Sequence, residues 1–229
     1  MLEEENGVDP RLQAISAAIR VVPHFPKPGI MFNDITPLLL RPEVFKDVVE
    51  IFVDRYRDMG IAAVAGIEAR GFIFGPSIAL AIGAKFIPLR KPKKLPGEVI
   101  SETYVLEYGT DCLEMHVGAV QPGERILIID DVIATGGTLS AAIRLLERAG
   151  AEVVECACLL GLPKFKAEWK ARVHSRGVPS VTSDVPLFIV RSFSCLLKKS
   201  HVKPFRPFPR VSLQANVATK SLIIAEASS

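Results

Sequence analysis

The amino-acid sequence predicts an α/β fold in which a mostly parallel sheet is flanked by helices. Apolar runs of strand length alternate with stretches of helical periodicity between residues 61 and 160. This alternation is typical of a parallel sheet covered on both faces. One complete strand–turn–helix–strand unit lies within residues 126–160. The chain has 229 residues, 49% of them hydrophobic, and is therefore long enough for one substantial core.

Apolar spacing and proline predict the first elements. Leu12, Ile15 and Ile19 recur at helical intervals and indicate an N-terminal helix. Residues 23–29 contain three prolines, so a loop must follow. Residues 31–40 mix apolar and polar side chains. A second helix is expected to begin at Pro42, which suits a first helical position, and to end at Gly60, with a buried stripe of Phe45, Val48, Val49, Phe52 and Tyr56.

The middle of the chain is predicted to alternate short strands with a helix and a hairpin. Residues 66–74 form a tight turn that leads into a helix reaching about residue 82. Two alternating stretches are expected to pair as a β-hairpin around Gly109. The predicted strands of this region cover residues 61–67, 85–89, 100–108 and 113–117.

Residues 126–138 carry the strongest functional signal. Four apolar residues predict a short buried strand, and Asp130 and Asp131 lie where that strand is expected to end. A glycine-bearing turn follows, and a helix is expected to begin at Thr138 and to stop at Gly150. The apolar positions that predict this helix are Leu139, Ala142, Ile143, Leu146 and Ala149.

This order of parts suits a sugar phosphate, bound beyond the carboxyl end of the strand. N–H groups at a helix start carry partial positive charge, and Gly136 and Gly137 let the backbone approach an anion without a Cβ. Thr135 and Thr138 can add hydroxyl donors, while the two aspartates can accept from ribose hydroxyls. Taken alone, an Asp-Asp pair is also common in turns and helix caps. The motif is neither a Walker loop nor the Gly-x-Gly-x-x-Gly of dinucleotide folds.

Two further segments add positive charge. Residues 65–71 form a second strand-to-helix turn with one cation, Arg70. This turn is either a plain tight turn or a loop that binds a diphosphate. Residues 90–97 are the densest basic run of the chain. They form either a solvated surface loop or a lid that brings cations to a departing diphosphate.

Residues 126–138 resemble the phosphoribosyl pyrophosphate motif of type I phosphoribosyltransferases. The form Ala134-Thr135-Gly136-Gly137-Thr138 is similar to that of the adenine phosphoribosyltransferases, and residues 90–97 resemble their Arg-Lys-x-x-Lys-Leu-Pro-Gly segment. The resemblance covers roughly residues 12–162. It implies the type I phosphoribosyltransferase fold, with a small N-terminal hood at about residues 23–40 and a β-hairpin lid at about residues 90–108.

The resemblance implies roles for residues that meet the diphosphate. Glu68 and Ala69 would belong to the binding loop, joined by a cis peptide, and Arg70 would be its catalytic cation. In the lid, the positions that match phosphate-contacting residues are Arg90, Lys91 and Lys94. Arg90 is expected to reach the site of a neighbouring subunit.

The resemblance also names two catalytic residues at the end of the first hairpin strand. Glu107 is expected to handle the proton of the base, and Tyr108 to help close the lid. Without the resemblance, Glu107 would be assigned to the exposed side of an alternating strand.

The base is expected in the hood. Phe32 would stack on the purine with Val132 opposite, and backbone groups near Met31 and Asn33 would read the base edge. Many relatives have Arg where Asn33 stands. Ala134 occupies the place of an Asp that contacts purine N7 in relatives using hypoxanthine or guanine, which implies that adenine is the acceptor.

These assignments predict an enzyme that transfers the 5-phosphoribosyl group from phosphoribosyl pyrophosphate to adenine, giving AMP and pyrophosphate. Mg²⁺ is the expected cofactor, held mainly by substrate and water and not by a protein metal site. The expected partners are the two substrates and a second copy of the chain in a homodimer. Two alternatives remain open: a regulator of the same fold that binds phosphoribosyl pyrophosphate without catalysis, and a transferase for another purine. The sequence has no helix-turn-helix pattern of the kind such regulators use.

Composition sets further limits. No apolar run approaches the roughly 20 residues of a membrane helix, and residues 1–10 are acidic and lack the apolar core of a signal peptide. A cytoplasmic protein without a membrane partner is therefore expected. None of the four cysteines, Cys112, Cys156, Cys158 and Cys195, shows metal-binding spacing. Cys156 and Cys158 are interpreted as small core residues on one face of a strand.

The net charge of +3 is unevenly distributed. Residues 191–229 contain seven Lys or Arg and one Glu, a net charge of +6, so the first 190 residues carry −3. The basic character therefore belongs to the tail, and no nucleic-acid partner is expected. We expect residues 1–190 to form the phosphoribosyltransferase domain, closed by a strand at residues 185–190. Residues 191–229 are expected to be a disordered or atypical tail, with a tail that binds an acidic partner as the alternative.

Overall fold

The structure, a computed structural model, describes residues 9–106, 109–162 and 189–190. The chain divides into two units, Met1–Cys195 and Leu196–Ser229, and every described residue belongs to the first. Glu107, Tyr108 and the predicted tail lie outside the described residues.

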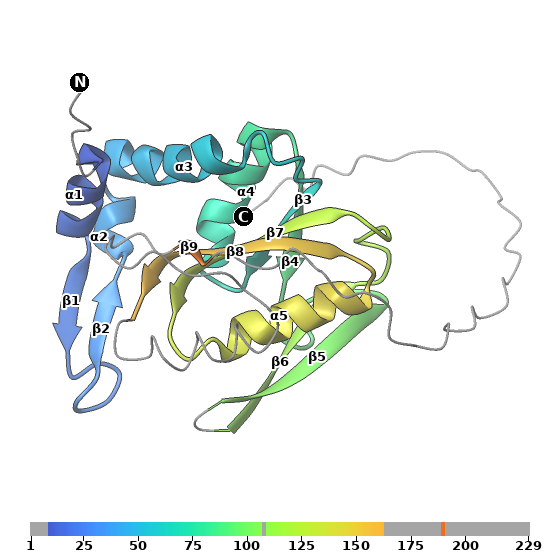
Figure 1. The fold of residues 1–229 in the computed structure, drawn as a ribbon. Coiled ribbons are helices and arrows are strands. Elements are labelled where there is room, and N and C mark those ends of the chain that lie inside the picture. Colours follow the sequence, from blue (N-terminus) through green and yellow to red (C-terminus); the bar gives the residue numbers. More distant parts are fainter. Residues whose placement is uncertain (1–8, 107–108, 163–188, 191–229) are drawn as a thin grey trace, which may run out of the picture. The chain divides into compact units, whose positions relative to one another are not determined.

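A five-stranded sheet forms the centre of the described part, in the order β4-β3-β7-β8-β9 (Figure 1). The first four strands are parallel, which confirms the predicted sheet, and β9 pairs with β8 in the antiparallel direction. Of the closing strand expected at residues 185–190, the structure describes β9. The strands are β3 (Ala63–Ile67), β4 (Lys85–Leu89), β7 (Arg125–Ile133), β8 (Glu152–Gly161) and β9 (Ile189–Val190).

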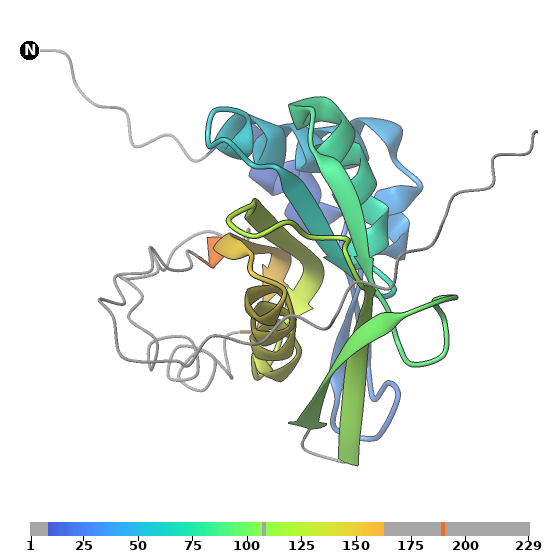
Figure 2. The ribbon, with the colours of Figure 1, turned by 90° about the vertical axis from the view of Figure 1, so that its right-hand side faces the viewer.

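Helices cover both faces of this sheet (Figures 1 and 2). One face packs against α1 (Pro10–Ala17), α2 (Thr36–Leu39), α3 (Pro42–Tyr56) and α4 (Gly71–Ile82). The other face packs against α5 (Gly137–Arg148) and the hairpin of β5 (Val99–Leu106) and β6 (Gly109–His116). On β7 the apolar side chains alternate between the two layers. Leu127 and Ile129 lie in the first, Ile126 and Ile128 in the second.

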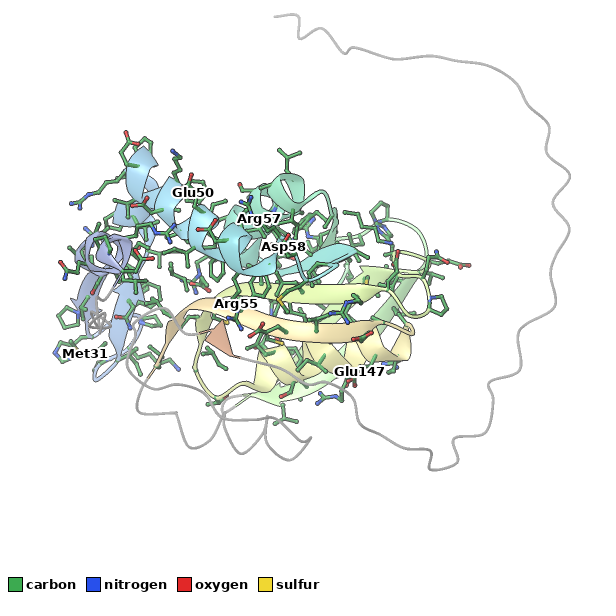
Figure 3. All side chains as sticks on the ribbon, turned by 45° about the horizontal axis from the view of Figure 1, so that its top comes forward. Met31, Glu50, Arg55, Arg57, Asp58 and Glu147 are labelled. Atoms are coloured by element: carbon green, nitrogen blue, oxygen red, sulfur yellow. The ribbon has the colours of Figure 1, made fainter. Side chains whose placement is uncertain are left out.

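Helix α3 begins at Pro42 as predicted, with proline in its first turn. Its stripe of Val48, Phe52 and Tyr56 is buried in the core. Near its end, Arg55 points toward the sheet (Figure 3) and pairs at 2.8 Å with the buried carboxylate of Glu155 on β8. This ion pair fixes the end of the helix against the sheet.

The structure differs from the sequence-based expectation in several places. Helix α3 ends at Tyr56 and not at Gly60, and residues 36–39 form the unpredicted short helix α2. Residues around the prolines form a hairpin of β1 (Arg20–Pro23) and β2 (Met31–Asp34), where only a loop was expected. Strand β6 begins at Gly109 and not at residue 113, because Gly109 already pairs with Leu106. Strand β7 continues through both aspartates to Ile133, because it still pairs with β8 there.

The β1–β2 hairpin lies beyond the carboxyl ends of β7 and β8 (Figure 1). The turn from β3 to α4 reaches the same edge, and Gly71 lets it approach closely, since a Cβ there would collide with the carbonyl oxygen of Ile129. No helix among the described residues is long and apolar enough to cross a membrane.

Candidate active site

Two strand-to-helix turns meet at the carboxyl ends of the neighbouring strands β3 and β7. Between them is a cavity of about 270 Å³. It brings together most residues predicted for the sugar phosphate and the diphosphate. The predicted residues that line it are Glu68, Ala69, Arg70, Lys91, Asp130, Asp131, Val132, Ala134, Thr135, Gly136, Gly137 and Thr138. The apolar residues Ile67, Ile133 and Leu139 also line it, and nothing in their spacing had indicated a site.

The start of helix α5 forms one wall of this cavity. Gly136 is the N-cap residue at a φ of 79°, a left-handed conformation that glycine adopts without steric cost. No side chain caps the helix, so its first N–H groups are available to an anion. Thr135 and Thr138 line the cavity on either side of the two glycines.

Two carboxylates lie at the end of β7. Asp131 is 3% exposed, and its Oδ2 is 2.9 Å from Nε of Arg70. Asp130 is half-buried and accepts a hydrogen bond from the Asp131 N–H at 2.9 Å. Burial, together with the Asp131 charge, raises the pKa of Asp130. Burial also raises the pKa of Asp131, although Arg70 opposes the shift. Carboxylates held in this way are well placed to accept from ligand hydroxyls.

The loop after β3 has a cis peptide between Glu68 and Ala69, as the resemblance implied. The Glu68 carboxylate accepts from Nε and Nη2 of Arg90, at 3.1 and 3.3 Å, and from the Lys91 N–H at 2.8 Å. The Arg90 side chain is the main reason why the pKa of Glu68 is lowered. Glu68 therefore secures the start of the basic segment, a role that no sequence spacing had indicated.

Only part of the basic segment at residues 90–97 reaches the first cavity. Lys91 lines the cavity, whereas Arg90 and Lys94 are not among its lining residues. In the single chain, the Arg90 side chain pairs with Glu68, and its Nη1 donates to the Lys94 carbonyl at 3.3 Å. Lys94 is exposed.

A second cavity, of about 400 Å³, lies under the β1–β2 hairpin. Arg70 lines both cavities, and its Cζ is 5.6 Å from the centroid of the Phe32 ring. Phe32 therefore lies next to Arg70, a residue of the first cavity, but does not line that cavity itself. The residues around this cavity are Arg20, Val22, Phe25, Phe32, Asp34, Ile35, Thr36 and Arg70.

The other residues predicted to contact the base do not lie together around one cavity. Phe32 and Asp34 face the second cavity, while Met31 and Asn33 line neither cavity. Met31 is 56% exposed on the hairpin (Figure 3). Val132 lines the first cavity and not the second.

The sequence-based prediction missed one ion pair at the base of this hairpin. Arg20 donates to Asp34 at 2.6 Å, from the position directly opposite it on the neighbouring strand. Hydrogen bonds from Thr36, and then the one from Arg20, lower the pKa of Asp34 to about 2. A cross-strand pair of this kind leaves no signal in a sequence until the strand register is known.

Within the part of the chain that the structure describes, no group of three or more His, Cys, Asp or Glu side chains could hold a metal ion.

The fold and the two joined turns define the class of type I phosphoribosyltransferases. The profile of the phosphoribosyl transferase domain matches residues 36–193, and the chain belongs to this family. The curated relatives are more specific. The chain is 73% identical over 174 residues to adenine phosphoribosyltransferase 2 of Arabidopsis thaliana, covering 75% of this chain and 91% of the relative.

Two further comparisons agree. The chain is 70% identical over 166 residues to "adenine phosphoribosyltransferase 1, chloroplastic" of the same plant, covering 72% of this chain and 68% of the relative. It resembles a crystal structure of the Saccharomyces cerevisiae adenine phosphoribosyltransferase in complex with an imino-altritol bisphosphate and adenine. That similarity has a TM-score of 0.68 and 36% identity over 72% of this chain and 94% of the yeast chain.

Proposed function

We propose that this chain transfers the 5-phosphoribosyl group of phosphoribosyl pyrophosphate to N9 of adenine, giving AMP and pyrophosphate in purine salvage. The observation that carries the proposal is the single cavity in which the uncapped start of α5, the two aspartates and Arg70 meet. The high identity to named adenine phosphoribosyltransferases supports this reaction.

Each wall of the cavity suits one part of phosphoribosyl pyrophosphate. The 5-phosphate would bind the N–H groups at the start of α5 and the hydroxyls of Thr135 and Thr138. Asp130 and Asp131 would accept from the ribose hydroxyls. The diphosphate would lie on the loop of Glu68 and Ala69, next to Arg70 and Lys91.

In the reaction, a bond forms between N9 of adenine and C1′ as the bond from C1′ to the diphosphate oxygen breaks. The electron pair of the broken bond leaves with pyrophosphate, so the nearby cations lower the barrier as that charge develops. We assign this role to Arg70 and to the lid residues Arg90, Lys91 and Lys94. Glu107 would take the proton of the base, with Tyr108 closing the lid over the site and excluding water.

Adenine is the proposed base because of the residues near the ribose site. Phe32, beside Arg70, offers a stacking surface, with Val132 on the other side of the base and backbone groups of Met31 and Asn33 at its edge. Ala134 lines the first cavity and has no polar group for purine N7. A 6-oxopurine would lose that contact, and such losses discriminate strongly.

The expected cofactor is Mg²⁺, bound mainly by diphosphate and ribose oxygens and water. Bound there, it would neutralise charge on the leaving group. We further propose a homodimer in which Arg90 reaches the neighbouring site, and a cytoplasmic location. Because one relative is named chloroplastic, imaging of a fluorescent fusion of the full chain is the direct test of location.

The reaction is tested with purified full-length protein, adenine, phosphoribosyl pyrophosphate and Mg²⁺. We expect AMP and pyrophosphate in equal amounts, and loss of both with an Asp131→Ala variant. Binding of phosphoribosyl pyrophosphate without any turnover would instead identify a regulator of the same fold.

A further inference from the structure

We propose that Asp111 is a positioning residue that competes with the diphosphate for the ammonium group of Lys91. This inference rests on the proposed function, because it requires that Lys91 meet a diphosphate in the first cavity. Asp111 would hold Lys91 at the edge of the first cavity before a diphosphate binds, and would draw it back when pyrophosphate leaves.

The Lys91 side chain has a defined partner outside the cavity that it lines. Its ammonium pairs with Oδ2 of Asp111 and lies 3.2 Å from the hydroxyl of Tyr104. That hydroxyl donates to the same Asp111 oxygen at 3.2 Å. Both partners lie on the β5–β6 hairpin, where they are directly opposite each other. The cation that borders the diphosphate site is therefore already bound by the hairpin.

The carboxylate is fixed more firmly than the ammonium. Oδ1 of Asp111 accepts from the Cys112 N–H at 2.8 Å, and Tyr104 is 5% exposed in the core beneath the hairpin. Lys91, by contrast, carries its charge at the end of a flexible four-carbon chain. A change of partner therefore requires movement of the lysine and not of the hairpin.

The pair is charged at neutral pH. Burial opposes ionisation of Asp111, but the hydrogen bonds from Lys91 and from the Cys112 N–H prevail and lower its pKa. The two side chains are 35% and 26% exposed, so the pair is partly screened by water. A diphosphate that recruits Lys91 must first separate this pair, which weakens its net binding.

Removing the charge of Asp111 should therefore strengthen binding of pyrophosphate. Asp111→Asn retains the shape of the side chain and can still accept from Tyr104, but it leaves the Lys91 charge uncompensated. For a partly exposed pair, we expect affinity for pyrophosphate to rise about threefold to tenfold. Pyrophosphate should also become a stronger product inhibitor by the same factor.

The experiment measures the Kd of Mg²⁺-pyrophosphate by calorimetry on the full chain, for the wild type and for Asp111→Asn. Glu114→Gln is the matched control. It removes the same charge from the same hairpin, but its partner is the Lys93 N–H at 3.0 Å and not Lys91. We expect its Kd to stay within about twofold of the wild type. Asp111→Glu keeps the negative charge, so its Kd for Mg²⁺-pyrophosphate should be close to that of the wild type.

A second pair of variants tests whether the effect passes through the lysine. In a Lys91→Met background, adding Asp111→Asn should leave the Kd unchanged. An unchanged or weaker affinity in the single Asp111→Asn variant would overturn the inference, as would an equal gain in the Lys91→Met background. Circular dichroism checks that each variant is folded, and Asp111→Ser provides a second neutral variant if Asp111→Asn is not.

The two proposals fail differently. A wild type that makes AMP but whose Asp111→Asn variant binds pyrophosphate no more tightly contradicts the role of Asp111 alone. A wild type that neither binds pyrophosphate nor makes AMP contradicts the proposed function, and this inference with it.

Discussion

At the scale of the residue, the site holds two carboxylates where folding disfavours their charge. Asp131 is nearly inaccessible and has one cationic partner, Arg70. Burial raises the pKa of both Asp130 and Asp131, and the Asp131 charge adds to the rise at Asp130. A ligand that donates hydroxyl hydrogen bonds would relieve this cost. The arrangement therefore favours ligand binding at the expense of stability in the ligand-free protein.

Asp130→Asn is expected to stabilise the ligand-free protein at pH 7. Because the pKa of Asp130 is higher in the folded state, the folded state binds more protons between the two pKa values. Stability therefore falls as the pH rises from about 3.9, the usual value for Asp, through the folded pKa. Asparagine does not ionise, so the stability of the Asp130→Asn protein does not fall in this way as the pH rises. Thermal unfolding should show a higher Tm than the wild type at pH 7 and a smaller difference near pH 4.

The exposed Asp58 provides the control, since Asp58→Asn should change the Tm little at either pH. An Asp130→Asn protein that is less stable than the wild type at pH 7 would contradict this account of the site.

At the scale of the element, the sequence predicted the strand-to-helix turns of the site, but not the β1–β2 hairpin or the ion pairs between distant segments. The unit of β7 and α5 was predicted because its apolar strand, glycines and helical stripe each carry their own signal. The β1–β2 hairpin was missed because each of its strands has four residues, too few to show alternation. Glu68 and Asp111 were not linked to the basic segment, because they lie about 20 positions from their partners.

The close approach of α4 to the sheet predicts different effects for two glycines of this helix, Gly71 facing β7 and Gly75 facing β4. A Cβ on Gly71 would meet the Ile129 carbonyl oxygen, which is fixed in the sheet. A Cβ on Gly75 would meet the Phe86 ring at 2.6 Å, and a side chain can move. We expect Gly71→Ala to lower the free energy of unfolding by at least about 2 kcal/mol, and Gly75→Ala to change it by no more than about 1 kcal/mol.

Urea denaturation of the two variants tests this difference. Gly71 is the first residue of α4 and Gly75 lies inside the helix, so the gain in helix propensity from alanine belongs mainly to Gly75→Ala. Equal free energies of unfolding would show that the contact with Ile129 does not limit the turn.

At the scale of the whole molecule, the sheet brings together segments that are far apart in the chain. The hairpin of β1 and β2, the turn after β3 and the turn after β7 meet at one edge, and Arg70 borders both cavities. The match to the family profile ends at residue 193, close to the end of the first unit at Cys195. The site that the structure describes thus lies within the first unit.

We predict that a chain ending at Val190 folds and retains most of its activity. All residues that line the two cavities precede that position. Circular dichroism and the rate of AMP formation, both compared with the full chain, measure the effect. A shortened protein that is unfolded, or that has lost most of its activity, would show that residues 191–229 contribute to the domain.

The central claim is that this chain is a transferase specific for adenine, and a base comparison tests it most directly. With phosphoribosyl pyrophosphate and Mg²⁺ held saturating, the release of pyrophosphate is measured with adenine and with hypoxanthine. We predict turnover of adenine with a kcat/KM at least about 100-fold above that of hypoxanthine, because Ala134 cannot make the polar contact that a 6-oxopurine needs. Equal kcat/KM values for the two bases, or no release of pyrophosphate with adenine, would contradict it.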